Sequence, residues 1–522
     1  MSDSIATTTQ GPVRGIADAG GTHTFLGIPY GANPVGDLRF RPPVPAAPWD
    51  GIRSALEFGP TCPQAPTSAA NSLAPAGDDC LALNVWTPAP SDGAKRPVMI
   101  WLHGGGFRGG SASRPFTDGA NLSKRGDVVV VSLNHRLNVL GFLELEEICG
   151  PQFAGSGVAG MLDIVLALEW VRDNIEQFGG DPSNVTIFGE SGGGRKVSML
   201  MGMPAATGLF HRAIIESGAH PRAVPRPLAS LLARHVFTAL DLAVGDIDAL
   251  QAIPGEELFA RVERALAGID DPDLPAASAG RWMTFSPVLN RTHLPAHPFD
   301  PASPEGSDVP LIIGTNKDEM ALFHSQLPNA GTLDDRALSD RLRGVFGDGT
   351  ERVIDAHRRA RPRDSTWDHF VSITSEDRRL LSIETAEEKS RQAAAKGGAP
   401  VYMYLFTWES DYQLLKAAHT MEIPFVFHNL GSTPIVGTRE DRTLLADTMS
   451  DTWIAFARSG DPNHAGLPAW DPYDVDQRAT MLFDVPPRLE SDPRAEERLA
   501  WGDLRPSLPW EGAAFVGSQA AR

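Results

Sequence analysis

The sequence predicts an α/β protein whose central sheet is mainly parallel and covered by helices on both faces. Apolar, β-rich runs recur along the chain with helical patterns between them. These runs are continuously apolar rather than alternating, which is typical of strands buried on both faces. The runs are VMIWLHG (98–104), VVVVSLNHR (128–136), VTIFGES (185–191), AIIESG (213–218), PLIIGTN (310–316) and VYMYLFTW (401–408).

The clearest helical pattern lies between the second and third of these runs, in residues 161–180. Two consecutive glycines end the pattern, as they commonly end helices. We expect a helix that crosses over between parallel strands. Its apolar stripe is formed by Leu162, Val165, Leu166, Leu168 and Ile175.

The chain has 522 residues, more than one simple hydrophobic core usually serves. We expect one large elaborated α/β domain over residues 1–522. Two stretches look like helical insertions within it, lying over one side of the sheet. Residues 219–300 mix proline with short helical patterns, and residues 330–397 are charged and helical.

Composition limits the possible partners. The 65 acidic and 46 basic residues give a net charge of -19, which repels nucleic acids and anionic membranes. The first residues, MSDSIATTTQ, do not resemble a signal peptide, and no run of about 18 apolar residues occurs. We therefore expect a cytoplasmic monomer or homodimer that acts on a small molecule without nucleic acid or membrane. The three cysteines lack the spacing of a metal site.

A nucleophile motif follows the third run. The segment Gly189–Gly193, GESGG, joins the strand VTIF to the helical pattern RKVSMLMGM. This is the GxSxG elbow in the strand-to-helix context that it requires, because its glycines permit a sharp turn that exposes the serine. We interpret Ser191 as the nucleophile; a tight structural turn is the alternative.

A serine hydroxyl needs a histidine base that a carboxylate orients. With this elbow the chain order is serine, acid, histidine. Glu319 follows the run 310–316, and His419 follows the run 401–408. The adjacent Asp318 competes with Glu319, and His428 competes with His419.

The glycine run after the first strand predicts an oxyanion hole. In HGGG (103–106) no side chain hinders the approach of backbone N–H groups to a substrate. We assign the donors to the amides of Gly105, Gly106 and Gly192. Phe107 and Arg108 are candidate substrate contacts beside the loop.

Positive charge gathers near these motifs at Arg108, Arg195 and Lys196. These side chains could favour substrates that carry a carboxylate, although solvated or ion-paired surface residues are the better interpretation. Residues 104–109 also match GxGxxG, and residues 189–194 resemble a P-loop. Both nucleotide sites are rejected, because no long amphipathic helix follows the first motif and the second lacks the required lysine. No metal or cofactor is required.

The chain as a whole resembles the type B carboxylesterases of the α/β-hydrolase fold. The matching blocks include FLGIPYGANP, DDCLALNVWTP, WLHGGGF, NHRLNVLGFL, FGESGGG, GTNKDEM, HTMEIPFVF and WIAFARSGDPN. The resemblance implies the catalytic triad Ser191, His419 and Glu319, and it favours Glu319 over Asp318. It also implies an acyl-enzyme route to ester hydrolysis, without a cofactor.

Several structural features are implied only by this resemblance. Cys62 and Cys80 stand where relatives carry a disulfide, and Arg39 with Asp78 stands where they carry an ion pair. Gly192 replaces a more usual alanine, which we expect to loosen the elbow. The loop between the two cysteines has no aromatic residue, which argues against a choline ester as the preferred substrate.

Two other functions use the same features. Carbamates or activated amides need the same catalytic groups and differ from esters only in the leaving group. A noncatalytic adhesion or binding protein could also use the fold, but such proteins typically lose the nucleophile that this chain keeps. Hydrolysis of a small or medium-sized carboxylic ester is the function we expect.

Overall fold

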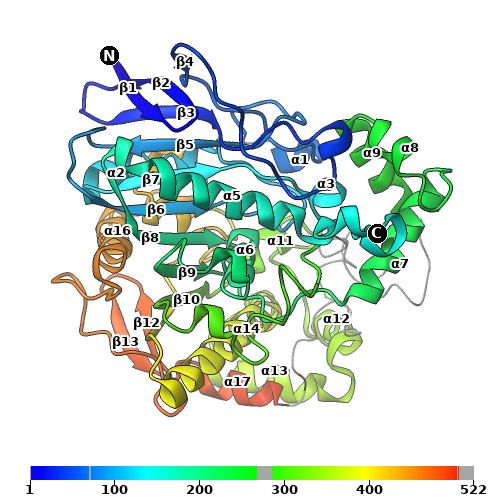
Figure 1. The fold of residues 1–522 in the computed structure, drawn as a ribbon. Helices are drawn as coiled ribbons and strands as arrows, with labels where there is room; N and C mark the ends of the chain where they lie inside the picture. Colours follow the sequence, from blue (N-terminus) through cyan, green and yellow to red (C-terminus); the bar gives the residue numbers. More distant parts are fainter. Residues whose placement is uncertain (1, 70–71, 267–284, 503, 505–522) are drawn as a thin grey trace.

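The computed structural model describes residues 2–69, 72–266, 285–502 and 504. One large sheet runs through the molecule, with strands in the spatial order β1-β2-β3-β5-β7-β6-β8-β9-β10-β11-β12-β13 and β4 beside β2 (Figure 1). The strands are β1 Ser2–Thr8, β2 Gly11–Ala17, β3 His23–Pro29, β4 Arg53–Ser54, β5 Ala82–Thr87, β6 Arg96–Leu102, β7 Val129–Leu133, β8 Gly180–Glu190, β9 Arg212–Glu216, β10 Leu311–Asn316, β11 Val401–Phe406, β12 Ala479–Phe483 and β13 Arg488–Ser491.

The expected α/β class and the six predicted strands are confirmed. They are the consecutive neighbours β7, β6, β8, β9, β10 and β11, and every pairing among them is parallel. The sequence pattern did not indicate the antiparallel strands at the two ends of the sheet. Strands β1, β2, β3 and β5 form the N-terminal end, and β13 closes the C-terminal end.

The sheet separates two hydrophobic cores, because successive side chains on a strand point to opposite faces. On β6, Val98, Ile100 and Leu102 belong to one core. Met99 and Trp101, between them, belong to the other. Both sets are buried, which explains why these runs are apolar without alternation.

Helices cover both faces of the sheet. Helices α5 and α6 pack on the first core, and α2 and α16 pack on the second. The helices are α1 Pro66–Ala69, α2 Ala120–Gly126, α3 Asn138–Phe142, α4 Glu146–Cys149, α5 Ala159–Asn174, α6 Gly192–Leu200, α7 Arg226–Ala239, α8 Ile247–Ala252, α9 Gly255–Leu266, α11 Ala321–His324, α12 Asp335–Phe346, α13 Thr350–Ala360, α14 Thr366–Lys396, α15 Ile423–Val426, α16 Arg442–Ser459 and α17 Ala495–Trp501.

The predicted crossover helix is α5. A short 3₁₀ turn extends it to Phe178, and Gly179 follows with a left-handed φ of 78°. Residues 151–178 are long and apolar enough to cross a membrane by length and composition, but 89% of the apolar window is buried inside the protein. That burial is expected of a core helix in a folded domain.

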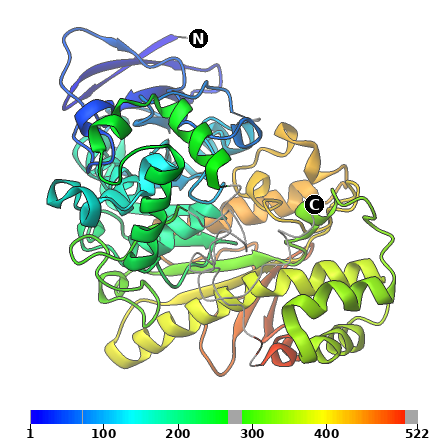
Figure 2. The same cartoon turned by 90° about the vertical axis from the view of Figure 1, so that its right-hand side faces the viewer.

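The two predicted insertions are largely helical. Residues 219–300 contain α7, α8 and α9, with 267–284 outside the described residues, and residues 330–397 contain α12, α13 and α14. Figure 2 shows the long helix α14 running beneath the sheet, next to α12 and α13. Helix α14 packs against β10 and β11, which brings it close to the ends of these strands.

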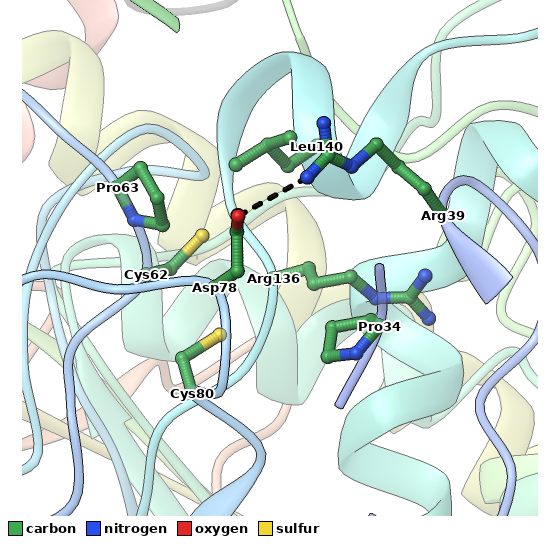
Figure 3. A pocket seen from close by; sticks show the side chains of 8 residues that line it. All are labelled: Pro34, Arg39, Cys62, Pro63, Asp78, Cys80, Arg136 and Leu140. Atoms are coloured by element: carbon green, nitrogen blue, oxygen red, sulfur yellow. Dashed lines mark hydrogen bonds and ion pairs between the residues drawn. The ribbon is translucent and has the colours of Figure 1, made fainter. Parts of the chain in front are cut away.

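A small pocket near the N-terminal region contains the two cysteines that the resemblance paired (Figure 3). Cys62 and Cys80 are buried and both are free thiols in this structure. The expected ion pair is confirmed beside them, with Arg39 Nη2 3.1 Å from Asp78 Oδ2. Asp78 also accepts a hydrogen bond from the Gly255 amide at 3.3 Å, so the pair links this pocket to the start of α9.

A second ion pair lies in the core between the loop after β7 and helix α5. The Arg136 guanidinium donates to both carboxylate oxygens of Asp163, at 2.6 and 2.8 Å, and both side chains are almost completely buried. Arg136 also donates to the carbonyl of Arg41 at 2.8 Å. Because both side chains are buried, water cannot solvate either charge if its partner is removed.

We predict that Asp163→Ala lowers the free energy of unfolding by about 3–5 kcal/mol, because it leaves a buried guanidinium uncompensated. The matched control is Asp173→Ala on the same helix, where the Arg172 pair is about half exposed. That variant should change the stability by less than about 1 kcal/mol. Urea denaturation of both variants measures the difference, and equal losses would contradict the role given to the buried pair.

Candidate active site

The predicted site residues all follow strands of the parallel part of the sheet. The HGGG loop follows β6, Ser191 follows β8, Glu319 follows β10 and His419 follows β11. Because these strands are parallel, their carboxyl ends meet at one edge of the sheet, where ligands bind in this class of fold. Residues more than 300 positions apart in the chain are thus brought to one place.

Ser191 occupies a strained turn between β8 and α6. Its φ and ψ are 55° and -117°, outside the regions favoured by residues with a side chain. Its amide donates to the carbonyl of Glu216 at 2.8 Å, which fixes the turn to β9. At Gly193 a Cβ would lie 1.9 Å from the Leu102 carbonyl oxygen, so only glycine fits. The turn leaves the Ser191 side chain partly exposed.

The three amides predicted for the oxyanion hole lie close together. Gly105 and Gly106 have φ values of 96° and 65°, which glycine adopts readily. A Cβ on Gly192 would lie 2.3 Å from the Gly106 amide nitrogen. Within the described residues, none of these three amides donates a hydrogen bond. They are therefore available to a ligand.

Gly192 packs closely on the glycine loop. A methyl group there would also lie 2.3 Å from the Gly106 carbonyl oxygen, so a residue with a Cβ does not fit this arrangement without a shift. That Gly192 loosens the elbow stays a prediction.

His419 and Glu319 are in direct contact. His419 Nδ1 lies 2.5 Å from Glu319 Oε2, and the His419 amide donates to the Glu319 carbonyl at 3.2 Å. A proton on Nδ1 directed at Glu319 leaves Nε2 free to accept one. Burial acts to raise the pKa of Glu319, but the charges of His419 and Arg378 outweigh it and lower that pKa.

Ser191 approaches this pair without a direct bond. Among the described residues its hydroxyl forms no hydrogen bond with His419. The neighbouring Glu190 does reach the ring, with Oε1 3.1 Å from His419 Nδ1. Catalytic hydrogen bonds are often loose without substrate, so this geometry is compatible with a nucleophile and its base.

The two competing residues lie elsewhere. Asp318 is 3.5 Å from the Lys317 ammonium and accepts from the Ala417 amide at 3.3 Å. His428 follows the C-terminal end of α15, is partly exposed and lies 3.0 Å from Asp447. Neither contacts the Glu319–His419 pair.

Sequence reasoning missed a cluster of buried carboxyl groups behind the site. Glu190, Glu216 and Glu422 are at most 1% exposed. Burial raises the pKa of Glu216 to about 8, and burial together with neighbouring carboxylates raises the pKa of Glu190 and Glu422 well above the usual range. These shifts oppose ionisation of the three groups. Ser217 donates to Glu422 at 3.4 Å, within this network.

A second missed residue lies on α14. Arg378 Nη1 is 3.3 Å from both ring nitrogens of His419. Burial lowers the pKa of His419, and the positive charges of Arg378 and Arg195 lower it further, against the opposing effect of Glu319. No motif marks Arg378, because it is 41 residues from His419 and on a different element.

Of the two candidate substrate contacts, Phe107 is corrected, and Arg108 stays a prediction. The Phe107 side chain is completely buried and packs edge-on against Phe142, with ring centres 5.2 Å apart. Arg108 forms an ion pair with Glu263 of α9. Phe107 is therefore a core residue, and Arg108 ties the glycine loop to a helical insertion.

Lys196 is also not a pocket residue. It is completely buried in α6, and its ammonium donates to the His103 carbonyl at 2.7 Å. Burial, and then the charge of Arg114, lowers the pKa of Lys196 well below 10.5. The contact anchors the first residue of the HGGG loop. In the described part of the chain, no group of three histidine, cysteine or acidic residues is arranged to hold a metal ion.

The chain is similar in sequence and in structure to known carboxylesterases. A family model described as "Carboxylesterase family" matches residues 2–501. The chain is 35% identical to the para-nitrobenzyl esterase of Bacillus subtilis, covering 95% of this chain and 98% of that one. It is 34% identical to the phenmedipham hydrolase of Pseudarthrobacter oxydans, covering 92% and 94%. A crystal structure of a Geobacillus stearothermophilus carboxylesterase matches with a TM-score of 0.80 and 37% identity, covering 95% and 99%.

We predict that Lys196 gives the protein a characteristic pH dependence of stability. Its folded pKa is lowered, so the unfolded chain binds the extra proton and stability rises with pH up to about 10.5. Relative to Lys196→Met, the wild type should gain free energy of unfolding between pH 7 and 10. Denaturation of both proteins at several pH values tests this, and a difference independent of pH would contradict a buried lysine with a lowered pKa.

Proposed function

This chain belongs to the carboxylesterase family and is a serine ester hydrolase, and we propose that Ser191, His419 and Glu319 form its catalytic triad. The observation that carries the proposal is the 2.5 Å contact between His419 Nδ1 and Glu319, at the edge of the sheet where the strained Ser191 turn lies. A histidine held in this way has Nε2 as the ring nitrogen that can accept the proton of a serine.

In the first step the Ser191 hydroxyl attacks the ester carbonyl while His419 Nε2 takes its proton. Glu319 holds the ring and stabilises the imidazolium that forms. His419 then gives the proton to the departing alcohol, which leaves an acyl group on Ser191. In the second step water attacks the acyl group with the same base, and the acid is released.

The tetrahedral intermediates carry negative charge on the former carbonyl oxygen. The amides of Gly105, Gly106 and Gly192 make no hydrogen bond among the described residues, Gly192 lies against Gly106, and these amides would donate to this oxygen. Gly192 is also the first residue of α6, so the positive end of the helix dipole faces the same point. Fixed donors of this kind supply a large share of the rate enhancement in acyl transfer.

The buried carboxyl groups behind the triad fit the same proposal. Burial raises the pKa of Glu190, Glu216 and Glu422, which opposes their ionisation, whereas the pKa of Glu319 is lowered. Glu319 is therefore the carboxylate that acts on the ring.

Ser191→Ala should lower kcat for a neutral aryl ester by a factor on the order of 10⁴ to 10⁶, because it removes the attacking atom. The matched control is Ser183→Ala, an exposed serine on β8 that bonds only to Asp181. A fluorophosphonate probe should label the wild type and the control but not Ser191→Ala. Undiminished hydrolysis by Ser191→Ala would contradict the assignment of Ser191 as the nucleophile.

The pH dependence of kcat/KM should report His419. The base must be neutral, and its pKa is lowered from 6.5 by burial and by nearby arginines, so activity should persist on the acid side until the pH falls below 6.5. A profile from pH 4.5 to 9 on a neutral aryl ester measures this limb. A midpoint at or above 6.5 would show that His419 is not in the environment described.

A further inference from the structure

Arg378 places a permanent positive charge against the base of the site. Besides its contacts with both nitrogens of His419, it lies over the ring of Phe323, 5.5 Å from the ring centre. Phe323 in turn lies 5.5 Å from the His419 ring. The aromatic face holds the guanidinium in place by a cation–π contact. The side chain is 15% exposed, so it is not sealed in the core.

This guanidinium lacks a carboxylate of its own. In the part of the chain that the structure describes, only Glu319 comes within 4.0 Å of it, at 3.9 Å, and Glu319 is already hydrogen-bonded to His419. Its Nε is buried without a hydrogen-bond partner. Arginine normally binds a carboxylate through two parallel N–H groups. Arg378 therefore has unused capacity for an anion.

The charged groups near Arg378 do not neutralise its positive charge. Arg195, four residues after the nucleophile, adds a second cation, and the charge of Arg378 contributes, after burial, to lowering the pKa of Arg195 to about 10. On the acidic side burial raises the pKa of Glu190 well above its usual range and that of Asp377 to about 7. Arg378 thus faces Glu319, which is already bonded to His419, and a partly protonated Asp377.

The excess charge opposes catalysis unless it is neutralised. His419 must become an imidazolium in the transition state, and a cation 3.3 Å away disfavours that state. A substrate anion bound to Arg378 would offset the repulsion as the imidazolium forms. Such an anion would act on the transition state more than on the ground state, so it would raise kcat as well as lower KM.

We propose that the natural substrates of this enzyme are esters that carry a free carboxylate, bound by Arg378. This inference rests on the proposed function, because it takes His419 as the base. The carboxylate must lie close to the ester, since Arg378 touches the ring that exchanges the proton. Half-esters of dicarboxylic acids and esters of hydroxy acids have this chemistry.

The test compares matched anionic and neutral esters. With the carboxylate on the acyl side, the pair is the mono-4-nitrophenyl ester of glutaric acid and 4-nitrophenyl pentanoate. With the carboxylate on the alcohol side, the pair is 4-acetoxybenzoate and 4-acetoxybenzamide. In at least one pair the wild type should prefer the anionic ester in kcat/KM by tenfold or more, and the preferred pair identifies the side.

Arg378→Gln should reduce this preference by a factor on the order of 10 to 100, the loss typical of a charge-assisted hydrogen bond. Arg378→Lys keeps the charge but not the two-pronged geometry and should retain part of the preference. The matched control is Arg391→Gln on the same helix, which removes a charge paired with Glu387 and Glu388, about 20 Å further along. The control should leave both kcat/KM values unchanged.

A pH profile gives an independent readout. The groups facing His419 are Glu319, Glu190, Arg378 and Arg195. Removing the Arg378 charge makes protonation of His419 easier, so the acid limb of Arg378→Gln on a neutral ester should move to higher pH. A residue that only supports the fold would not move this limb in a defined direction.

The outcomes separate the two proposals. If Ser191 is required for the neutral esters but neither anionic ester is preferred, the proposed function stands and the carboxylate inference fails. The inference also fails if Arg378→Gln changes kcat/KM for anionic and neutral esters by the same factor. If Ser191→Ala hydrolyses the neutral esters normally, the triad itself is wrong and both fall.

Discussion

The close packing of the Ser191 turn against strand β6 is the constraint on which the site depends. The turn can form only because Gly193 lies on the Leu102 carbonyl and Gly192 lies on Gly106, with no space for a side chain at either contact. These contacts set the height of the nucleophile above the sheet and bring the glycine loop beside it. The amide of Ser191 then ties the same turn to β9. Three neighbouring strands thus determine the position of one side chain.

The groups around His419 differ in their charge. Directly against the ring lie one ionised carboxylate, Glu319, and one guanidinium, Arg378. Glu190 also reaches the ring, and burial raises its pKa and that of Glu422, which opposes the addition of further negative charge there. The protein as a whole carries a net charge of -19, which repels anions at long range. The positive charges of the site would therefore attract an anionic ligand only after that ligand has entered the site.

The chain alone indicated the central strands, the elbow and the order of the site residues, because each of these has a local pattern. Continuous apolar runs identified β6 to β11, and the strand-to-helix context identified Ser191. The antiparallel strands at the ends of the sheet were missed because only one side of several of them is buried, as the mixed pattern of β2 shows. Their short alternating segments do not stand out from loops.

The remaining errors concern contacts between distant segments. Phe107 was expected to contact the substrate, but its side chain lies in the core. It packs there against Phe142, which belongs to another element of the chain. The close contact of Gly192 with Gly106 was not foreseen, because it joins loops from two different strands. Arg378 could not be found at all, since a single arginine on a 31-residue helix has no distinguishing neighbours in sequence. Such residues become visible only when the tertiary packing is known.

Assembly of the site from the ends of separate strands also affects how activity arises during folding. The glycine loop, Ser191, Glu319 and His419 come from β6, β8, β10 and β11, so the site is complete only when all four strands are in place. Parallel sheets with pairings of long sequence separation form slowly. A nascent or partly folded chain therefore carries a serine without its base and without its oxyanion donors. Hydrolytic competence would then be among the last properties that the chain acquires, and its appearance would mark completion of the fold.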